Sequence, residues 1–367
     1  MAKDKVVLVL PFSGRGVGGG LAVVNEEMAR GLMEAGYDVT VLVMEVPAEF
    51  APNPQEHGNA RIVTIKNDKT KAIKNPGGSD EERQTLYNEM RRVIEDPAVT
   101  SAEQLGLPKD WKPDVIIGHS RFSGPAAIEL KRRFFPDAKT TYVLHSDPIG
   151  TSAVTGEESL GVIKSTQEMY WMNQADQVAA NGPHLRDVAV ELARAGALWL
   201  DKTPPPVIEF IPGHTITEPV HPEDPGKPTP FKIGILGRLE AGLKGFDDLF
   251  RAVRSAPFRP GCPPIEVAAL GFSMPDGMEP EKFQGDIARM QAALNQLLLD
   301  QGFRNTGSTW EWVHPEVPVT VTVLPSTKDK AEVIRRLRSL DALFMPSHQE
   351  GMGVVASEAF ENGVPPV

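Results

Sequence analysis

The stretch KVVLVLPFSGRGVGGGLAVVNEEMARGLMEAGYDVTVLVM, residues 5–44, contains two apolar runs separated by a glycine-rich segment and a helical pattern. Leu21, Val24 and Met28 recur at three- and four-residue spacing, which predicts one apolar face of a helix. Gly36 follows where a left-handed C-cap is expected. The stretch therefore predicts a strand, a glycine turn, a helix and a second strand, the unit from which parallel sheets are built.

Short apolar runs of the same kind recur along the chain and alternate with helical patterns. They are almost continuously apolar, which is typical of strands buried on both faces of a parallel sheet. The fold class is therefore α/β, with two Rossmann-like, doubly wound lobes. Strands are expected at 5–10, 38–44, 61–65, 113–118, 140–145, 176–180 and 207–211, and then at 231–237, 265–270, 319–324 and 341–346; the second half should also contain helices at 245–255, 280–301 and 327–339.

Two domains are expected, because 367 residues exceed one typical core. The first spans 1–212 and the second 231–367, and residues 213–230 form a proline-rich linker. The stretch 201–230 holds nine prolines and offers few good helix positions. Residues 66–110 interrupt the alternation with a polar, charged and helical insertion, for which we expect a solvated excursion without chemistry of its own.

The composition, 41% hydrophobic and 24% charged residues, is that of a globular protein. A net charge of −11 argues against a dedicated nucleic-acid binder, so no nucleic-acid partner is expected. A single cysteine, Cys262, excludes an intramolecular disulfide. No run reaches the ~18 apolar residues that span a bilayer. We expect a cytoplasmic protein without a transmembrane segment, and peripheral membrane contact stays open.

The first candidate site is SGRGVGGG, Ser13 to Gly20, between the first strand and its helix. Glycines let a ligand approach the backbone, and the following helix presents unpaired N–H groups to an anion. The dinucleotide-binding pattern fits only loosely, because Glu45, the nearest acidic residue after the second strand, is followed by Val-Pro. A phosphate-facing loop and a merely tight turn both remain open.

The second candidate is GRLEAGLKG, residues 237–245, which follows the first strand of the second lobe. Open α/β sheets bind ligands at this carboxyl edge. Arg238 and Lys244 lie six positions apart across the loop, so both can turn onto one diphosphate. Two solvated surface cations are the alternative interpretation.

The third candidate is PSHQEGMGVVASEAFENGVPPV, residues 346–367. Glu350 and Glu358 are eight positions apart, about two helical turns, so both can face one cleft. A carboxylate can accept hydrogen bonds from sugar hydroxyls, and the amides bared by glycines between the two glutamates can hold phosphate oxygens. A helix start enriched in Glu for its dipole explains one glutamate but not these glycines.

Together these motifs resemble the donor-binding signature of retaining glycosyltransferases with the GT-B fold, family-four type (glycosyl transferases group 1). The shared features are Pro-Ser, Glu-Gly-x-Gly, a second Glu that closes a Glu-x7-Glu spacing, and Gly-x-Pro, in that order. GRLEAGLKG is similar to the diphosphate-gripping loop of the family. The resemblance covers nearly all of the chain and implies two Rossmann-like lobes that face a cleft.

The resemblance also implies a role for each matching residue. Glu358 would hold the nucleotide ribose, and Glu350 would hydrogen-bond the transferred sugar. Arg238 and Lys244 would neutralise the departing diphosphate. The remaining donor contacts would come from the backbone of Gly351, Met352 and Gly353, which would face the sugar and phosphates, and from Gly19 and Gly20, which would face the donor phosphate or the acceptor.

Two histidines end predicted strands: His119 ends PDVIIGH and His145 ends TTYVLH. Taken alone, each is best interpreted as a structural histidine. The resemblance implies that His145 lines the catalytic centre and contacts the transferred sugar. His119, followed by Ser120 and Arg121, would face the acceptor.

The implied chemistry is hexosyl transfer with retention of anomeric configuration. A cationic clamp on the diphosphate lets the sugar–oxygen bond ionise toward an oxocarbenium-like state, so catalysis is mostly charge stabilisation and positioning. The leaving phosphate would help to take the acceptor's proton. No Asp-x-Asp metal site is present, so we expect no metal and no cofactor besides the nucleotide-diphosphate sugar. The base, the sugar and the acceptor (glycan, lipid, small molecule or protein) stay open, as does the oligomeric state.

Two departures from the family pattern stand out. The segment IPGHTITEP, 211–219, lacks the asparagine of the family's Ile-Pro-Asn-Gly turn. After Gly-x-Pro the chain stops at Pro366-Val367, which reads like the start of another strand, so we expect a second lobe that lacks part of its sheet. The alternative function is therefore a truncated, catalytically silent protein that only binds a nucleotide sugar or a partner.

Overall fold

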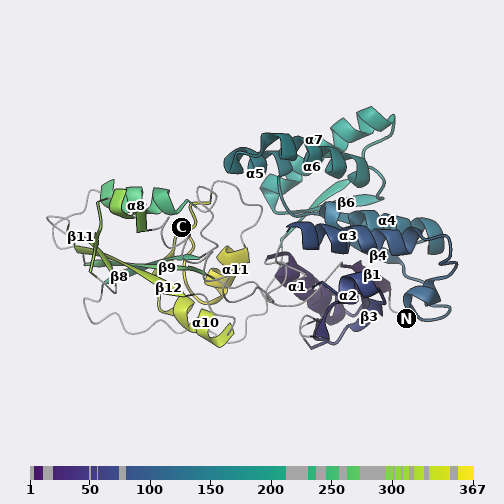
Figure 1. Ribbon diagram of the computed structural model, residues 1–367, viewed down its shortest axis with the longest axis horizontal. Helices are drawn as coiled ribbons and strands as arrows, with labels where there is room; N and C mark the ends of the chain where they lie inside the picture. The colour runs from purple at the N-terminus through teal and green to yellow at the C-terminus, as the bar shows by residue number, and fades with distance from the viewer. Residues whose placement is uncertain are drawn as a thin grey trace. The chain divides into compact units, whose positions relative to one another are not determined.

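The computed structural model divides into two compact units, Met1–Gly213 with Pro275–Met278 (unit 1) and His214–Met274 with Glu279–Val367 (unit 2). Figure 1 shows the helices and strands of both. The residues that the structure describes are 4–10, 20–48, 51–55, 57–73, 80–211, 230–236, 245–255, 263–272, 295–296, 298–300, 302–306, 309–313, 318–325, 330–347 and 354–367.

The described part of unit 1 is built on a seven-stranded sheet in the order β3-β2-β1-β4-β5-β6-β7. All neighbouring strands are parallel. The strand order reverses between β1 and β4, which is the topological switch point where open α/β sheets bind ligands. The strands are β1 (Lys5–Val9), β2 (Asp38–Met44), β3 (Arg61–Ile65), β4 (Val115–His119), β5 (Lys139–Leu144), β6 (Gln177–Asn181) and β7 (Val207–Phe210).

Helices cover both faces of this sheet. Val7 and Val9 belong to a core cluster with residues of α3 and α4. Val6 and Leu8, which alternate with them, belong to a separate cluster with Ala29 of α1. This burial on both faces confirms the interpretation of the continuous apolar runs. The helices are α1 (Gly20–Glu34), α2 (Asp68–Lys71), α3 (Asp80–Glu95), the 3-10 turn η2 (Ala102–Leu105), α4 (Ser120–Phe134), α5 (Pro148–Thr155), α6 (Glu158–Met172) and α7 (Pro183–Leu200).

The stretch 66–110 corrects one expectation. It contains α2, α3 and η2, but α3 is not a solvated excursion. Leu86, Met90 and Ile94 are fully buried in the core of unit 1. Their four-residue spacing places them on one face of the helix, and that apolar stripe outweighs the many charges on the opposite face.

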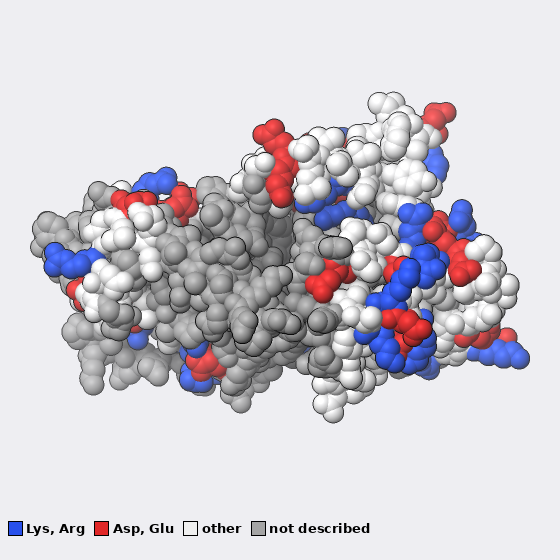
Figure 2. Space-filling view, viewed as in Figure 1, with Lys and Arg blue, Asp and Glu red and all other residues white. Residues whose placement is uncertain are grey.

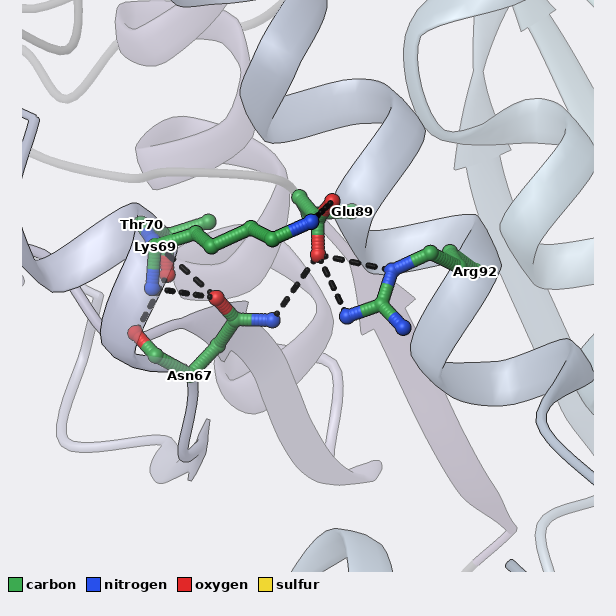
Figure 3. Close-up of polar contacts among 5 residues, drawn as sticks. All are labelled: Asn67, Lys69, Thr70, Glu89 and Arg92. Atoms are coloured by element: carbon green, nitrogen blue, oxygen red, sulfur yellow. Dashed lines mark hydrogen bonds and ion pairs between the residues drawn. The ribbon is translucent and has the colours of Figure 1, made fainter. Parts of the chain in front are cut away.

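Beside α3 lies a group of polar residues that we call the α2–α3 ion cluster: Asn67, Lys69, Thr70, Glu89 and Arg92 (Figure 3). The side chain of Asn67 caps α2 by accepting from the amides of Lys69 and Thr70, at 2.9 and 3.0 Å. Glu89 accepts hydrogen bonds from Asn67 Nδ2 at 3.2 Å, Lys69 Nζ at 3.1 Å and Arg92 Nη2 at 2.7 Å. The cluster therefore ties α2 to α3.

The described part of unit 2 contains a six-stranded sheet in the order β10-β11-β12-β9-β8-β13. From β12 to β13 the pairs are parallel, as predicted. The antiparallel pairs of β11 with β10 and β12 were not predicted, because a search for βαβ units overlooks a short edge hairpin. The elements are β8 (Phe231–Leu236), α8 (Phe246–Ser255), β9 (Ile265–Phe272), β10 (Arg304–Asn305), β11 (Trp310–Val313), β12 (Pro318–Pro325), α10 (Lys330–Arg338), β13 (Ala342–Leu343) and α11 (Val354–Glu361).

The last residues of the chain pair with β13. Pro366 forms a parallel bridge with Leu343. Val367 donates its amide to Leu343 O at 2.8 Å and accepts from the amide of Met345 at 2.8 Å. Pro366-Val367, predicted to start another strand, therefore pairs along β13 through an isolated bridge. Of the helix expected at 280–301, residues 295–296 and 298–300 are helical, and the rest lies outside the described residues.

The surface mixes charges of both signs. On the face drawn in Figure 2, described Lys and Arg side chains are interspersed with Asp and Glu. Among the described helices, none combines the length and the apolar character needed to cross a membrane.

Candidate active site

Two histidines meet at the carboxyl edge of the sheet of unit 1. His119 is the last residue of β4, and His145 directly follows β5, the neighbouring strand. His119 Nδ1 lies 2.8 Å from His145 Nε2, and the ring centroids are 5.0 Å apart with an interplanar angle of 30°. His119 is fully buried, whereas His145 keeps part of its surface accessible. The rings therefore form a hydrogen-bonded pair, and His145 is the partly exposed residue of the two.

The turn after β4 holds this pair in place. Ser120 has a φ of 43°, in the left-handed region that side chains other than glycine rarely adopt. Its Oγ donates to Val143 O at 3.3 Å and accepts from the amide of His145 at 3.2 Å. The amide of His119 donates to Ser123 Oγ at 2.9 Å. The hydrogen bonds of Ser120 thus join the end of β4 to the end of β5, and they satisfy polar groups that are buried there.

Both rings are held in the neutral form. Burial lowers the pKa of His119 well below its usual value, and the neighbouring His145 lowers it further. Burial also lowers the pKa of His145, to about 3. Water solvates an imidazolium far better than a buried site does, so the charged forms are disfavoured.

A buried carboxylate contacts the start of α4, two residues after His119. Glu168 of α6 is fully buried and accepts hydrogen bonds from the Tyr142 hydroxyl, from the amide of Arg121 at 3.2 Å and from Arg121 Nη1 at 3.4 Å. Burial raises the pKa of Glu168, although Arg121 and Tyr142 counteract this effect. Burial also raises the pKa of Tyr142, and the nearby Glu168 adds to the rise. We call His119, Arg121, Tyr142, His145 and Glu168 the carboxyl-edge cluster.

Close packing positions α4, the helix that carries Arg121. A Cβ at Gly118 would lie 2.6 Å from Ala127 Cβ, and one at Gly124 would lie 2.1 Å from Tyr142 Cε2. Glycine at both positions thus lets α4 approach β4 and β5. Arg121 is in the first turn of α4, and its guanidinium lies 4.4 Å from the ring centroid of Phe122. Its side chain remains 19% exposed.

In unit 2 two of the predicted motifs come together. β8 and β13 are parallel neighbours, with Leu343 paired to Gly234, so the loops that follow them leave the same edge of the sheet. Gly245, the last residue of GRLEAGLKG, has a φ of 64°. A Cβ built on it would lie 2.0 Å from the carbonyl oxygen of Pro346, the first residue of the C-terminal motif. The backbones of the two motifs are therefore in direct contact.

Residues 14–293 and 307–367 match the family described as "Family 4 Glycosyltransferase in conflict systems" (GT4-conflict). The chain belongs to this family. The match includes the second and third candidate sites completely and the first from Gly14 onward. Membership makes this protein a family-four glycosyltransferase, as the resemblance predicted. No curated protein matches the chain in sequence.

Solved structures of GT-B glycosyltransferases resemble this glycosyltransferase over almost its whole length. Trehalose-6-phosphate synthase from Burkholderia multivorans covers 100% of this chain and 83% of its own, at 15% identity and a TM-score of 0.58. The E. coli protein described as trehalose-6-phosphate bound with UDP-2-fluoro glucose covers 98% of this chain and 82% of its own, at 16% identity and a TM-score of 0.57. HepE from Anabaena, in complex with UDP and glucose, covers 99% of this chain and 80% of its own, at 14% identity and a TM-score of 0.54. At these identities the likeness establishes the GT-B fold alone.

The structure of the glycosyltransferase describes only some of the predicted site residues. Gly20 begins α1, His119 ends β4, Arg121 lies in α4, and His145 follows β5. Glu358 lies in α11 and is half-buried. The predictions for Gly19, Arg238, Lys244, Glu350, Gly351, Met352 and Gly353 fall outside the described residues.

Three residues near the histidines were not predicted. Glu168 lies on the buried face of α6 with Gly161, Ser165 and Met172. The small and polar residues at this helical spacing were the sequence feature that could have indicated a buried polar residue. Tyr142 is hidden in an ordinary apolar strand and gave no signal. Asn181 ends β6, one position beyond the Leu144–Ala180 pair, and its buried Oδ1 has no hydrogen-bond partner among the described residues. A polar residue at the end of a strand was the signal there.

Proposed function

We propose that this glycosyltransferase transfers a hexose from a nucleotide-diphosphate sugar to an acceptor hydroxyl with retention of anomeric configuration and without a metal. The main structural observation in support of this proposal is the contact between Gly245 and Pro346. It joins the last residue of GRLEAGLKG to the first residue of the C-terminal motif, which supports a donor site built from both motifs. Open α/β sheets bind nucleotides at the carboxyl edge of their strands.

The donor roles follow from the family motifs. Arg238 and Lys244 neutralise the diphosphate, Glu350 hydrogen-bonds the sugar, and Glu358 holds the ribose. The backbone of Gly351, Met352 and Gly353 faces the sugar and phosphates, and Gly19 and Gly20 face the donor phosphate or the acceptor.

The reaction needs little besides charge stabilisation. Positive charge on the diphosphate side favours departure of the phosphate and an oxocarbenium-like sugar. In transfer with retention the acceptor attacks from the face that the phosphate leaves, and the phosphate takes the acceptor proton. Two of the structural neighbours bind UDP and glucose or UDP-2-fluoro glucose, and a third, a trehalose-6-phosphate synthase, transfers a glycosyl group with retention. This likeness supports a nucleotide-sugar donor and retention.

In unit 1, the proposed contact with the transferred sugar is His145. The residue is partly exposed and its ring is neutral, which suits a hydrogen bond to an uncharged hydroxyl better than an ion pair. Arg121, 19% exposed at the first turn of α4, is the proposed contact with the acceptor.

A thermal-shift panel with UDP, GDP, ADP and their sugar conjugates tests donor binding. A ligand at a hundred times its dissociation constant adds roughly 2.7 kcal/mol of stability, which such a panel resolves. We expect a shift with one base, unchanged by EDTA and lost in Arg238→Ala. Arg251→Ala, which removes an exposed cation from α8, is the matched control and should keep the shift. A panel without any shift contradicts the proposed donor site.

Turnover separates the proposed enzyme from the silent binding protein. The nucleotide that shifts the protein is supplied as its sugar conjugate, and release of the diphosphate is measured with water as the acceptor. We expect slow hydrolysis that Glu350→Ala abolishes, with the anomeric configuration of the first product retained in NMR spectra. Binding without any turnover would favour the silent alternative, and an inverted product would refute retention.

A further inference from the structure

Two neighbouring residues at the end of β4 hold His145 from two directions. His119 contacts the ring of His145 at 2.8 Å, and Ser120 accepts from its amide at 3.2 Å. His119 and Ser120 are themselves fully buried. The ring and the backbone of His145 are thus both held by the same dipeptide.

The conformation of Ser120 is an uncommon one. Its φ of 43° lies in the left-handed region, which costs about 1 kcal/mol or more for residues other than glycine. Such residues persist where surrounding contacts over-determine them, and they gather at functional sites. Here the contacts are the two hydrogen bonds of Ser120 Oγ, one to Val143 within β5 and one to His145 directly after it.

The proton between the two rings has two alternative positions. If it sits on His119 Nδ1, then His145 Nε2 accepts, and the second proton of the pair lies on His145 Nδ1. If it sits on His145 Nε2, then His119 must carry its own proton on Nε2. His119 Nε2 is buried and has no partner among the described residues.

The two arrangements differ in what they leave buried. The first leaves a bare lone pair on His119 Nε2, and the second leaves an N–H group there without an acceptor. Buried N–H groups without an acceptor are rarer in proteins than under-used acceptors. The first arrangement is therefore favoured.

We propose that His119 and Ser120 are positioning residues that hold His145 as the neutral Nδ1–H tautomer, so that His145 presents a hydrogen-bond donor to an oxygen of the ligand. The tautomer follows from the geometry of unit 1 alone. The identity of the oxygen, a hydroxyl of the transferred sugar, rests on the proposed function.

This assignment has a consequence for the reaction. The Nε2 lone pair of His145 is occupied by the N–H of His119, and Nδ1 already carries a proton. His145 therefore has no free lone pair with which to take the proton of the acceptor hydroxyl. A general base on this ring is ruled out, and the proton goes to the leaving phosphate instead.

The tautomer is tested by NMR on the full chain with 15N-labelled histidine. The chain has eight histidines, and loss of one set of signals in His145→Asn identifies those of His145. We expect a pyrrole-type Nδ1 and a pyridine-type Nε2 for His145. The reverse pattern would overturn the proposal.

Two substitutions of His119 sharpen the test. In His119→Asn the amide N–H replaces the imidazole N–H at the Nδ1 position, and we expect the tautomer of His145 to persist. In His119→Asp an acceptor takes that position, and we expect the proton to move to His145 Nε2. Donor hydrolysis should then fall at least tenfold further in the Asp variant than in the Asn variant. An unchanged spectrum in a folded His119→Asp protein would refute the role of His119.

These outcomes are separate from those of the donor panel. The NMR pattern is read in the absence of ligand, so a failed nucleotide shift refutes the proposed function and leaves the tautomer standing. Conversely, a nucleotide shift together with a pyridine-type Nδ1 on His145 supports the donor site and refutes the positioning role.

Discussion

The carboxyl-edge cluster and the α2–α3 ion cluster each contain a buried carboxylate beside an arginine, yet the pKa values of the two carboxyls are shifted in opposite directions. In the first, burial raises the pKa of Glu168 and lowers those of both histidines, so each group is shifted toward its neutral form. In the second, burial would raise the pKa of Glu89, but hydrogen bonds from Arg92, Lys69 and Asn67 outweigh it and lower the pKa to about 2. Burial therefore decides the pKa of the carboxyl in the first cluster, and hydrogen bonds from cations decide it in the second.

The difference comes from how far the cationic partners of each carboxyl are exposed to solvent. The Glu89 side chain is 10% exposed, and its cations Lys69 and Arg92 are 66% and 54% exposed, so their charges stay hydrated while they neutralise the carboxylate. Glu168 is 0% exposed and has one cation, Arg121, which is itself 19% exposed. A carboxylate therefore stays charged where its partners reach solvent, and it moves toward its neutral form where they do not.

The largest effect is expected for Glu168→Ala. This change leaves the Tyr142 hydroxyl and the Arg121 amide buried without an acceptor and leaves Arg121 without its carboxylate. Each buried donor left without an acceptor costs roughly 1–3 kcal/mol, so we expect a total loss of about 2–6 kcal/mol. Urea unfolding followed by tryptophan fluorescence measures the loss.

Glu168→Gln is the matched control. Its amide keeps an oxygen for Arg121, and its NH2 group can donate to the Tyr142 hydroxyl, so the cost should be about 1 kcal/mol. If Gln proved as damaging as Ala, Glu168 would be held as a charge, and the contrast between the two clusters would fail.

The second effect is the loss of stability on mild acidification, caused by the histidines. Their pKa values are lowered in the folded protein, so unfolding takes up protons between about pH 6.5 and pH 3, and stability falls as the pH decreases through that window. From pH 7 to pH 5 each neutral histidine contributes a loss of about 2 kcal/mol. His119→Asn should remove that share from the difference between the two pH values. An unchanged difference in this variant would mean that His119 is charged in the folded state.

The third effect concerns Glu89 and has a lower pH window. Its pKa is lowered, so the stability it contributes is complete above about pH 4.5 and is lost as the pH falls toward 2. Because its cations are exposed and screened, we expect only about 1 kcal/mol between pH 5 and pH 3. Glu89→Gln should lose this dependence, and 1 M salt should weaken it in the unsubstituted protein. Salt should leave the histidine effect at the carboxyl edge unchanged, and an equal response in both clusters would contradict the comparison.

These clusters also show how far sequence reasoning extends. The strands at 38–44 and 61–65 were predicted to the residue, because continuous apolar runs between polar turns have few other interpretations. His119 and His145 were found at the ends of predicted strands, and the family resemblance made them candidates; the structure adds that these two strands are parallel neighbours. The motifs of unit 2 were recognised from their resemblance to the family in residue type, spacing and order.

The rest depends on packing between distant segments. Glu168 reaches Arg121 across 47 positions, and only the packing of α6 beside α4 brings them together. The buried stripe of α3 was hidden by its many charged residues, because its three apolar residues are outnumbered in the stretch 80–95. The hairpin of β10 and β11 uses strands of two and four residues, too short for periodicity to reveal.

The smallest effect, for Tyr142→Phe, tests the charge state of Glu168 most directly. The substitution keeps the ring against Gly124 and removes only the hydroxyl that donates to Glu168. A hydrogen bond to a neutral group contributes about 1 kcal/mol, and one to a charged group about 1.5–3 kcal/mol. Since the pKa of Glu168 is raised, we expect the cost to be smaller at an acidic pH than at an alkaline pH, where more of the carboxyl is ionised. Urea unfolding at both pH values measures it. A cost that is large and equal at both would place a permanent charge on Glu168, and the carboxyl-edge cluster would then hold charge as the α2–α3 ion cluster does.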